Sequence, residues 1–366
     1  MGATSKLVLL AAGGTGGHLF PAEALAVALG KHGITVDLAT DTRAAHFKFP
    51  ARQVHLIPSA TLRGKDPLSY ARTLTLLGAG ITKALLMLGR VKPAVVVGFG
   101  GYPTIPPLFA ASLRRIPTVL HEQNGVMGRA NRLLAPRVTA IATGFRDVAG
   151  VDAALKSKLR FTGNPIRPAV LAAASVPYEA PVPNGPFRLT VFGGSQGARV
   201  MSDVVPEAIE RLPSALRERL VVVQQARGED LDRVQAAYAR LHVAAETATF
   251  FPDLPGRIAA SHLIVSRSGA STVAELSAIG RPAVLVPLPH ALDQDQLANA
   301  RVLEKAGGAI CIEQVNFSAE RLAAEITALA ADPQRLGRMA AAAKSAGTID
   351  AADRLAAVVM QVGAIG

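Results

Sequence analysis

The chain has 366 residues, of which 50% are hydrophobic and 18% charged, and its single cysteine, Cys311, excludes an intramolecular disulfide. This length and composition allow a large core and favour two domains. The net charge of +12 arises in residues 1–162, where 20 Lys and Arg stand against 7 Asp and Glu, so we expect an anionic partner. Phosphorylated substrates and anionic lipid are favoured over nucleic acid, because only 4% of residues are aromatic and none is Trp.

Short apolar runs alternate with Ala- and Leu-rich helical patterns along the whole chain. Runs such as VVVG at 95–98 are apolar throughout, as expected where helices cover both faces of a parallel sheet. The sequence therefore predicts an α/β fold. Strands are predicted at 7–11, 34–39, 94–97, 118–121, 138–142, 188–192, 220–224, 262–265, 283–286 and 309–312, and helices at 21–32, 106–114, 199–212, 229–241, 271–279, 294–306 and 318–331.

The first strand runs into AAGGTGGHLF at 11–20. Leu19 stands where a dinucleotide fingerprint needs a small third residue, and no Lys-Ser/Thr of a P-loop follows. Asp37 and Asp41 still have the spacing of a ribose contact, so a nicotinamide-dependent oxidoreductase stays an alternative. Glycines before a helix N-terminus favour an anion site; the other interpretation is a plain strand–helix turn.

The segment at 70–92, YARTLTLLGAGITKALLMLGRVK, is apolar almost all round. Such a helix lacks the charged face of an ordinary surface helix. It is either a buried core helix or a helix with one face in the interface of an anionic bilayer. Its cations are Arg72, Lys83, Arg90 and Lys92, and Arg114 and Arg115 would extend that surface.

A second glycine loop lies at 98–107, and a Pro-rich connector at 174–187 precedes a renewed strand–glycine–helix pattern at 189–201. We therefore predict two doubly wound domains that face each other across a cleft, with ligands at the carboxyl ends of the strands. The domains are residues 1–162 with about 348–366, and residues 163–347. Arg167 in GNPIR could reach a diphosphate or be an exposed hinge arginine.

Two polar clusters follow in the second half, SRSGASTVAEL at 266–276 and PHALDQDQLANA at 289–300. Thr272 and Glu275 have the spacing of a capping box, whereas a functional Glu275 would accept hydrogen bonds from two sugar hydroxyls. The polar side chains of the second cluster suit carbohydrate binding or helix capping equally. They are Asp293, Asp295, Gln296 and Asn299.

Six motifs in order, GGTGGH, GGY, HEQN, GNPIR, GGSQGAR and SGASTVAE, closely resemble the MurG-type family of bacterial peptidoglycan glycosyltransferases over about residues 6–360. The resemblance implies a glycosyltransferase-B fold whose C-terminal helix, about 350–363, returns to the first domain. It implies inverting transfer of GlcNAc from UDP-GlcNAc to the MurNAc 4-hydroxyl of undecaprenyl-linked lipid I, which forms lipid II. It also implies a peripheral enzyme at the cytoplasmic face of the inner membrane, with the nucleotide sugar in the second domain.

The resemblance further implies a set of donor contacts. The sequence departs from the family pattern at three places. Family members usually carry Gln or His at the position of Asp295, and a smaller aliphatic residue often stands at the position of Phe251. The loop 290–294 looks one residue longer than in some relatives. The implied contacts are Thr15, Gly16, Gly17 and Asn124, then Arg167 and Ser195 near the diphosphate, the backbone of Phe251 at uracil, Ala270, Ser271, Thr272, Val273, Ala274 and Glu275 along the nucleotide with Glu275 at the ribose, and Gln296 at the GlcNAc hydroxyls.

Inverting transfer needs a base on the face opposite the leaving UDP. His18 is the first candidate because an unperturbed imidazole titrates near pH ~6.5; alternatively it only hydrogen-bonds the acceptor phosphate. Glu122 is the second candidate. No cluster of acidic residues or His with metal-ligand spacing is visible, so the sequence predicts a reaction without metal or cofactor.

Three other functions remain open at this stage. One is another two-domain nucleotide-sugar enzyme, such as a glycolipid glycosyltransferase or a UDP-GlcNAc epimerase. The second is the nicotinamide-dependent oxidoreductase named above. The third is a basic, non-enzymatic protein that binds a membrane or nucleic acid.

Overall fold

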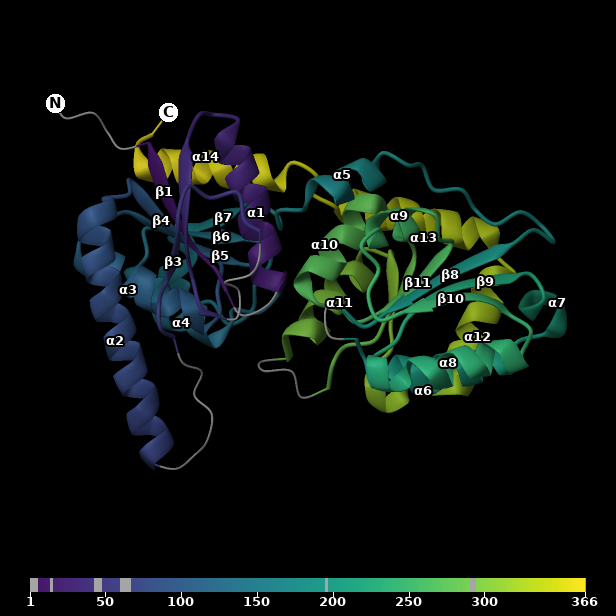
Figure 1. Ribbon diagram of the computed structural model, residues 1–366. Helices are drawn as coiled ribbons and strands as arrows, with labels where there is room; N and C mark the ends of the chain where they lie inside the picture. The colour runs from purple at the N-terminus through teal and green to yellow at the C-terminus, as the bar shows by residue number, and fades with distance from the viewer. Residues whose placement is uncertain are drawn as a thin grey trace. The chain divides into compact units, whose positions relative to one another are not determined.

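The computed structural model describes residues 6–13, 16–42, 48–59, 67–194, 197–289 and 294–365, with the side chains of 67–70 left aside. The chain forms two compact units (Figure 1). The first contains Met1–Arg167 and Ile349–Gly366, and the second contains Pro168–Thr348.

The first unit is built on a seven-stranded sheet in the order β3-β2-β1-β4-β5-β6-β7, and every neighbouring pair is parallel. Helices cover both faces, which explains why two strands at its centre, LVLLA at 7–11 and VVVG at 95–98, have no polar side chain. The strands are β1 (Leu7–Ala11), β2 (Thr35–Thr40), β3 (Val54–Leu56), β4 (Val95–Gly98), β5 (Thr118–Glu122), β6 (Ala140–Thr143) and β7 (Leu159–Phe161), and the helices are α1 (Gly16–Gly30), α2 (Pro67–Val91), α3 (Ile105–Leu113), α4 (Arg129–Leu134) and α14 (Ala351–Gly363).

The second unit contains a six-stranded parallel sheet in the order β10-β9-β8-β11-β12-β13. Its strands are β8 (Phe187–Phe192), β9 (Leu220–Gln225), β10 (Ala244–Ala248), β11 (Leu263–Ser266), β12 (Ala283–Leu285) and β13 (Ala309–Cys311). Its helices are α5 (Pro168–Ala174), α6 (Arg199–Glu210), α7 (Ser214–Arg217), α8 (Gly228–Arg240), α9 (Leu254–Ala259), α10 (Ala270–Ile279), α11 (Asp295–Lys305), α12 (Ala319–Ala330) and α13 (Pro333–Ala346).

The predicted fold class of two doubly wound parallel α/β domains is confirmed, and each predicted strand overlaps an observed one. Three strands were not predicted: β3, β7 and β10. All three lie at the edge of a sheet and are largely exposed or half-buried. An edge strand lacks a neighbour on one side, so its sequence carries no continuous apolar run.

The C-terminal helix α14 packs on α1 in the first unit. Leu355, Ala356 and Val359 of α14 share one buried cluster with Leu25 and Leu29 of α1. The apolar face of α14 therefore completes the layer that covers one face of the first sheet, although more than 180 residues of the second unit separate the two helices in sequence.

Asp37 is fully buried in β2 and is occupied by structural contacts. Its carboxylate accepts hydrogen bonds from Arg52 Nε at 2.9 Å and Nη2 at 2.8 Å, and His55 Nε2 lies 3.0 Å from it. These contacts tie the short edge strand β3 to β2. The suggested role of Asp37 as a ribose ligand is therefore wrong, because its acceptor sites are directed at β3 and the segment before it.

We expect Asp37→Asn to lower the free energy of unfolding by about 1–2 kcal/mol at neutral pH. Hydrogen bonds and charge from Arg52 and His55 outweigh the cost of burial and lower the pKa of Asp37. A lowered carboxyl pKa stabilises the fold above the unfolded-state value of about 3.9 and is lost as pH falls through the folded-state value. Urea unfolding from pH 3 to 7 measures the free energy of unfolding, which should fall less steeply toward low pH in the variant than in wild type. An unchanged dependence on pH would contradict this role.

Candidate active site

Both units have a topological switch point between two central strands. In each sheet the chain first adds strands outward on one side of the initial strand and then crosses to the other side. The switch lies between β1 and β4 in the first unit and between β8 and β11 in the second. Ligands of doubly wound folds bind at the carboxyl ends of the strands at this point. All the glycine loops identified in the sequence, except GNPIR, follow these four strands.

In the first unit His18 lies beside the loop that follows β4. A Cβ built on Gly101 would lie 3.3 Å from Cε1 of His18. Gly101 and the preceding Gly100 have φ of +73° and +84°, conformations that glycine adopts without strain. The structure thus brings the imidazole of the first glycine loop against the backbone of the second.

The other predicted contacts of this loop are Gly16 and Gly17, which form the first two residues of α1. A Cβ on Gly16 would lie 2.9 Å from the ring of Phe20, so a side chain at this position would collide with the helix's own next turn. Thr15, the third predicted contact, lies outside the described residues. The start of α1 presents backbone N–H groups at the switch point, as an anion site requires.

Glu122, the second residue of HEQN, ends β5 and is buried. Its carboxylate accepts hydrogen bonds from the Asn124 backbone N at 2.9 Å and Nδ2 at 3.3 Å, from Gly128 N at 2.9 Å and from Asn131 Nδ2 at 2.7 Å. Burial raises the pKa of Glu122, and these hydrogen bonds oppose that effect. The contacts favour a role in holding Asn124 and its loop over the role of general base.

His121, the first residue of HEQN, is fully buried in β5. Its Nε2 lies 3.2 Å from the carbonyl oxygen of Gly163, and burial lowers its pKa to about 4, so it is neutral at physiological pH. Asn164 Nδ2 donates to the carbonyl oxygen of Gln123 at 2.8 Å. HEQN and GNPIR are therefore one hydrogen-bonded assembly, which their separation of about 40 residues in the sequence does not reveal.

Arg167 ends the GNPIR segment and docks on α1. Its guanidinium lies 4.1 Å from the centre of the Phe20 ring, a cation–π contact. Burial raises the pKa of Glu23, and the positive charge of Arg167 opposes this rise. The alternative of an exposed hinge arginine is therefore wrong: the side chain is half-buried on the helix that carries His18.

In the second unit the loop after β8 is fastened to β9. Gly193 N donates to Gln225 Oε1 at 3.1 Å, and Gln225 Nε2 donates to the carbonyl oxygen of Thr249 at 3.1 Å. Gly194 and Gly197 have φ of +84° and +67°. The predicted contact Ser195 lies between them and outside the described residues. Gln225 was not identified from the sequence, because an amide within an apolar strand pattern has no distinctive spacing.

The predicted Thr272–Glu275 capping box is wrong. Helix α10 begins at Ala270 with Gly269 as its N-cap residue, so Thr272 is the third residue of the helix. Glu275 lies in the second turn and is 8% exposed. Of the other predicted nucleotide contacts on this helix, Ala270 and Val273 are buried, and Ser271, Thr272 and Ala274 are half-buried.

The loop before α10 is joined to the start of α11. Ser268 Oγ donates to the carbonyl oxygen of Gln296 at 2.8 Å, and Asn299 Nδ2 donates to that of Ser268 at 3.1 Å. Gln296 Oε1 accepts from Leu288 N at 3.1 Å, which orients its amide. Asp295 is the first residue of α11, after the N-cap residue Gln294, and its Oδ1 accepts from the Gln296 backbone N at 2.8 Å. The structure thus unites two of the predicted polar clusters; Asp293 lies outside the described residues.

Two arginines that the sequence analysis did not single out support this edge. Arg257 stacks 4.4 Å from the centre of the Phe251 ring and pairs with Glu246 and Asp253 at 2.6 and 2.8 Å, so it holds the predicted uracil segment. Arg267 is buried and donates to the carbonyl oxygens of Val286 and Pro287, both at 3.0 Å. The only sequence signal for Arg267 is a cation directly after an apolar strand.

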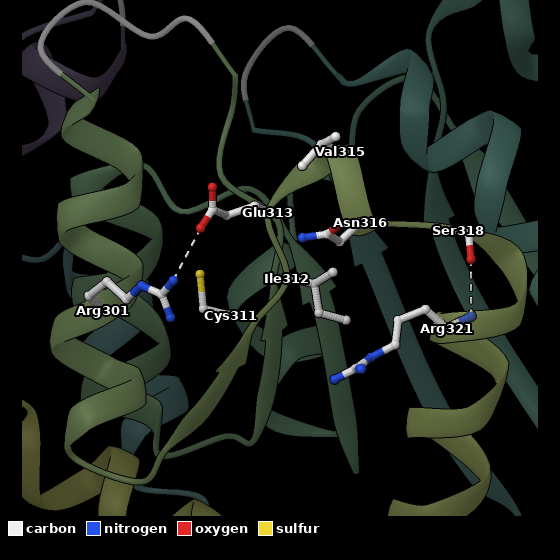
Figure 2. Close-up of a pocket in the computed structure, with 8 residues that line it drawn as sticks. All are labelled: Arg301, Cys311, Ile312, Glu313, Val315, Asn316, Ser318 and Arg321. Carbon is white, nitrogen blue, oxygen red and sulfur yellow. Dashed lines mark hydrogen bonds and ion pairs between the residues drawn. The ribbon is translucent and has the colours of Figure 1, made fainter.

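A cavity of about 500 Å³ also opens in the second unit, between Arg301 of α11 and Arg321 of α12 (Figure 2). Cys311 lines it, and burial raises the pKa of this thiol to about 11. None of the predicted site residues lines this cavity. Across the described ranges no three His, Cys, Asp or Glu side chains gather as metal ligands; the reaction without metal stays a prediction.

Comparisons with known proteins agree with this architecture. Residues 8–143 match the glycosyltransferase family 28 N-terminal domain and residues 188–355 match its C-terminal domain. The chain is 60% identical over 363 residues to a Rhodopseudomonas palustris BisA53 protein named UDP-N-acetylglucosamine--N-acetylmuramyl-(pentapeptide) pyrophosphoryl-undecaprenol N-acetylglucosamine transferase, covering 99% of this chain and 97% of that one. It is 59% identical to the Nitrobacter hamburgensis protein of the same name, with 98% of both chains covered.

Solved structures give the same result. The crystal structure of Acinetobacter baumannii MurG superposes with a TM-score of 0.77 at 27% identity, covering 97% of this chain and 99% of that one. UDP-GlcNAc 2-epimerase from Neisseria meningitidis shares the fold alone, with a TM-score of 0.66 at 15% identity over 97% of this chain and all of the other. The chain therefore belongs to glycosyltransferase family 28, among the N-acetylglucosamine transferases of the MurG type.

Proposed function

We propose that this chain transfers GlcNAc from UDP-GlcNAc to the MurNAc 4-hydroxyl of undecaprenyl-pyrophosphoryl-MurNAc-pentapeptide, with inversion, and so forms lipid II. The observation that carries the proposal is the identity of about 60%, over nearly the whole chain, to transferases named for these substrates. The geometry supports it, because glycine loops suited to phosphate follow the switch-point strands of both units.

Each unit has its own task in this proposal. The second, residues 163–347 in the sequence-based division, holds UDP-GlcNAc. Ser195 binds the diphosphate, and the backbone of Phe251 contacts the uracil. Ala270–Glu275 line the nucleotide, and Gln296 binds the sugar hydroxyls. The first, residues 1–162 with about 348–366, binds the acceptor. Its proposed donor contacts are Thr15, Gly16, Gly17 and Asn124, while Arg167 supplies positive charge near the diphosphate. What supports a donor site in the second unit is the joining of the α10 and α11 segments by Ser268 and Asn299.

The chemistry needs charge stabilisation at the leaving group and removal of one proton. UDP leaves as an anion, so backbone N–H groups at helix N-termini and a guanidinium stabilise it without a general acid. His18 removes the proton from the attacking hydroxyl. The contact of its ring with Gly101 supports this role, because it keeps the imidazole at the switch point of the basic unit.

Release of UDP from UDP-GlcNAc, measured with and without a lipid I analogue, tests the proposed function. We expect release only in the presence of the acceptor, together with a product that contains one added GlcNAc. Release without acceptor would favour an epimerase-type enzyme. Failure to bind UDP, or quenching of NAD(P)H fluorescence, would contradict the proposal and revive the binding-protein or oxidoreductase alternatives.

We further propose that the first unit binds the cytoplasmic face of the inner membrane through α2. Ala71–Val91 is, in the described part of the chain, the one helix long and apolar enough to cross a bilayer by length and composition, but only 22% of its apolar window is buried. Its inner face includes Thr73, Gly80, Ala84 and Leu88. A Cβ on Gly80 would lie 2.2 Å from the carbonyl oxygen of Pro58, so this face is docked closely.

The outer face of α2 combines apolar and basic side chains. Leu74, Leu76 and Leu86 are 67%, 38% and 60% exposed. Arg72, Lys83 and Arg90 are exposed on the same helix. This excludes the alternative of a wholly buried core helix. Exposed leucines with interspersed cations suit the interface of an anionic bilayer, and a helix docked on one side suits peripheral rather than spanning attachment.

We expect the double change Leu74→Ser and Leu86→Ser to weaken binding to anionic vesicles about tenfold, since each leucine loses apolar contact with lipid. Cosedimentation with phosphatidylglycerol vesicles measures this, and added salt should weaken wild-type binding further. Leu171→Ser with Val182→Ser, two exposed apolar positions of the second unit, is the matched control. Equal losses in both double variants would contradict docking through α2.

A further inference from the structure

The two ends of the glycine loop after β8 contact the last residue of β9 and the segment that follows β9. Gly193 N donates to Gln225 Oε1 at 3.1 Å. At the other end, a Cβ on Gly197 would lie 3.0 Å from Cγ of Arg227. Because β9 is the parallel neighbour of β8, both segments leave the sheet at the same carboxyl edge. Arg227 therefore lies against the loop that the proposed function assigns to the donor diphosphate.

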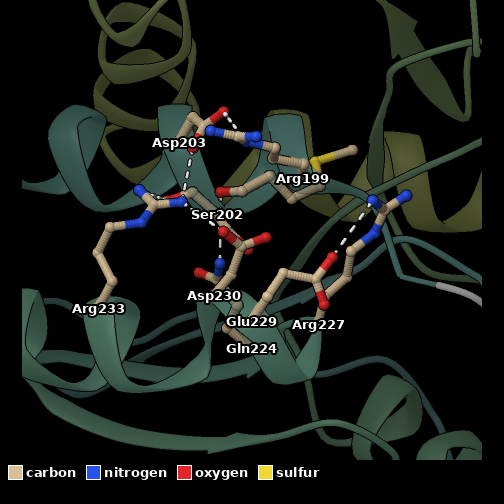
Figure 3. A network of polar contacts seen from close by, with 9 residues as sticks. Arg199, Ser202, Asp203, Gln224, Arg227, Glu229, Asp230 and Arg233 are labelled. Atoms are coloured by element: carbon tan, nitrogen blue, oxygen red, sulfur yellow. Dashed lines mark hydrogen bonds and ion pairs between the residues drawn. The ribbon is translucent and has the colours of Figure 1, made fainter.

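Arg227 is paired less closely than its neighbour Arg233 (Figure 3). Arg233 contacts Asp203 at 2.6 Å and Asp230 at 2.8 Å, so its charge is neutralised in place. Within the described ranges, the one acidic partner of Arg227 is Glu229, at 3.7 Å between Nη1 and Oε1. Its Nε is buried and, among the residues that the structure describes, has no hydrogen-bond acceptor. A buried guanidinium N–H without an acceptor is costly unless a ligand supplies one.

The surroundings of Arg227 are also electropositive. Burial lowers the pKa of Arg267, and the positive charge of Arg227 lowers it further, so the two guanidinium groups lie within electrostatic reach. Arg267 is committed to backbone carbonyls, whereas the Arg227 side chain is 39% exposed. Arg227 is in addition the N-cap residue of α8, a 13-residue helix whose N-terminal N–H groups favour negative charge.

We propose that Arg227 is a further donor-binding residue, whose guanidinium takes a phosphate oxygen of the nucleoside diphosphate beside Gly197. This inference rests on the proposed function. In the free protein Glu229 holds the guanidinium in a long ion pair, and the diphosphate displaces it. Arg227 thus recognises the diphosphate and not the nucleoside, because its neighbours are a glycine backbone and a second cation.

Competition binding of UDP and of uridine to the full chain tests the inference. We expect Arg227→Gln to lower the affinity for UDP about tenfold, which is the scale of one lost hydrogen bond to a charged group. The affinity for uridine should stay unchanged. Glu229→Gln should strengthen UDP binding about two- to threefold, because it removes a competing surface ion pair. Arg240→Gln, at the opposite end of α8 and paired with Glu210, is the matched control and should change neither ligand.

The outcomes separate the inference from the function on which it rests. If wild type binds UDP but Arg227→Gln binds it equally well, Arg227 does not contact the diphosphate. If the affinities of the variant for UDP and for uridine fall in the same proportion, Arg227 only supports the loop, and the inference is overturned. If wild type fails to bind UDP at all, the proposed function itself fails and the inference fails with it.

Discussion

Replacing His18 with alanine is expected to lower turnover by about 10²- to 10⁴-fold, the usual contribution of a positioned general base. Binding of UDP-GlcNAc should stay nearly unchanged, because the proposed donor residues lie mainly in the second unit. His18 is in the first turn of α1, so alanine preserves the helix. UDP release at saturating acceptor gives kcat, and calorimetry with UDP gives donor affinity.

The kinetic parameters distinguish the two roles considered for His18. A base acts in the transition state, so its loss lowers kcat; a side chain that only binds the acceptor phosphate raises the KM for acceptor and leaves kcat intact. His32→Ala is the matched control, since His32 is exposed in the turn that follows the same helix. If His18→Ala kept the kcat of wild type, the proposal that His18 removes the proton would be wrong.

Arg281→Met is expected to lower the free energy of unfolding of the second unit by about 3–5 kcal/mol, because several buried carbonyl oxygens lose a charged hydrogen-bond donor. Arg281 is 1% exposed. It donates to the carbonyl oxygens of Ala259, Ile279 and Gly280 at 2.9, 3.0 and 3.1 Å, and to those of Val176 and Pro177, both at 3.2 Å.

These partners explain the size of the effect. Ala259 and Ile279 are the last residues of α9 and α10, where unpaired carbonyls and the helix dipole favour a cation. Val176 and Pro177 belong to the connector between α5 and β8 of the same unit. Methionine keeps much of the volume but donates no hydrogen bond, so several buried carbonyls lose their partner.

Urea unfolding followed by circular dichroism, with hydrogen exchange to assign the loss to the second unit, measures this effect. The free energy of unfolding of Arg281→Lys should lie between those of wild type and Arg281→Met, because lysine keeps the charge but has fewer hydrogen-bond donors. Arg338→Met serves as control, since Arg338 is 69% exposed and lies 3.9 Å from its partner Asp332. A loss below about 1 kcal/mol in Arg281→Met, the range of a single ordinary hydrogen bond, would contradict the assigned role.

The strand–helix order and the family followed from the sequence alone, for a physical reason. Central strands of a parallel sheet are covered on both faces, so β1, β4 and β11 must be continuous apolar runs. Glycines after β1, β4 and β8 mark where backbone must approach a ligand or another loop. Six such motifs in fixed order identify one family, and the comparisons confirm it.

The tertiary structure alone decided which polar side chains are occupied. Asp37 is bound by Arg52 and His55, and Glu122 by the loop that carries Asn124. Neither pairing has a sequence spacing that could reveal it. The capping box failed for the same reason: the loop before α10 is held by Gln296 and Asn299, and the helix begins three residues earlier than Thr272 as N-cap predicts.

Position in the sheet and exposure of a helix face are likewise properties of the folded chain. The edge strands β3, β7 and β10 resemble loops in sequence, because solvent replaces a neighbouring strand. The apolar pattern of α2 suited a core helix and an interfacial helix equally, until packing buried one face and left Leu74 and Leu86 outside. Sequence determines which residues can be buried or charged, whereas long-range contacts determine which of them meet.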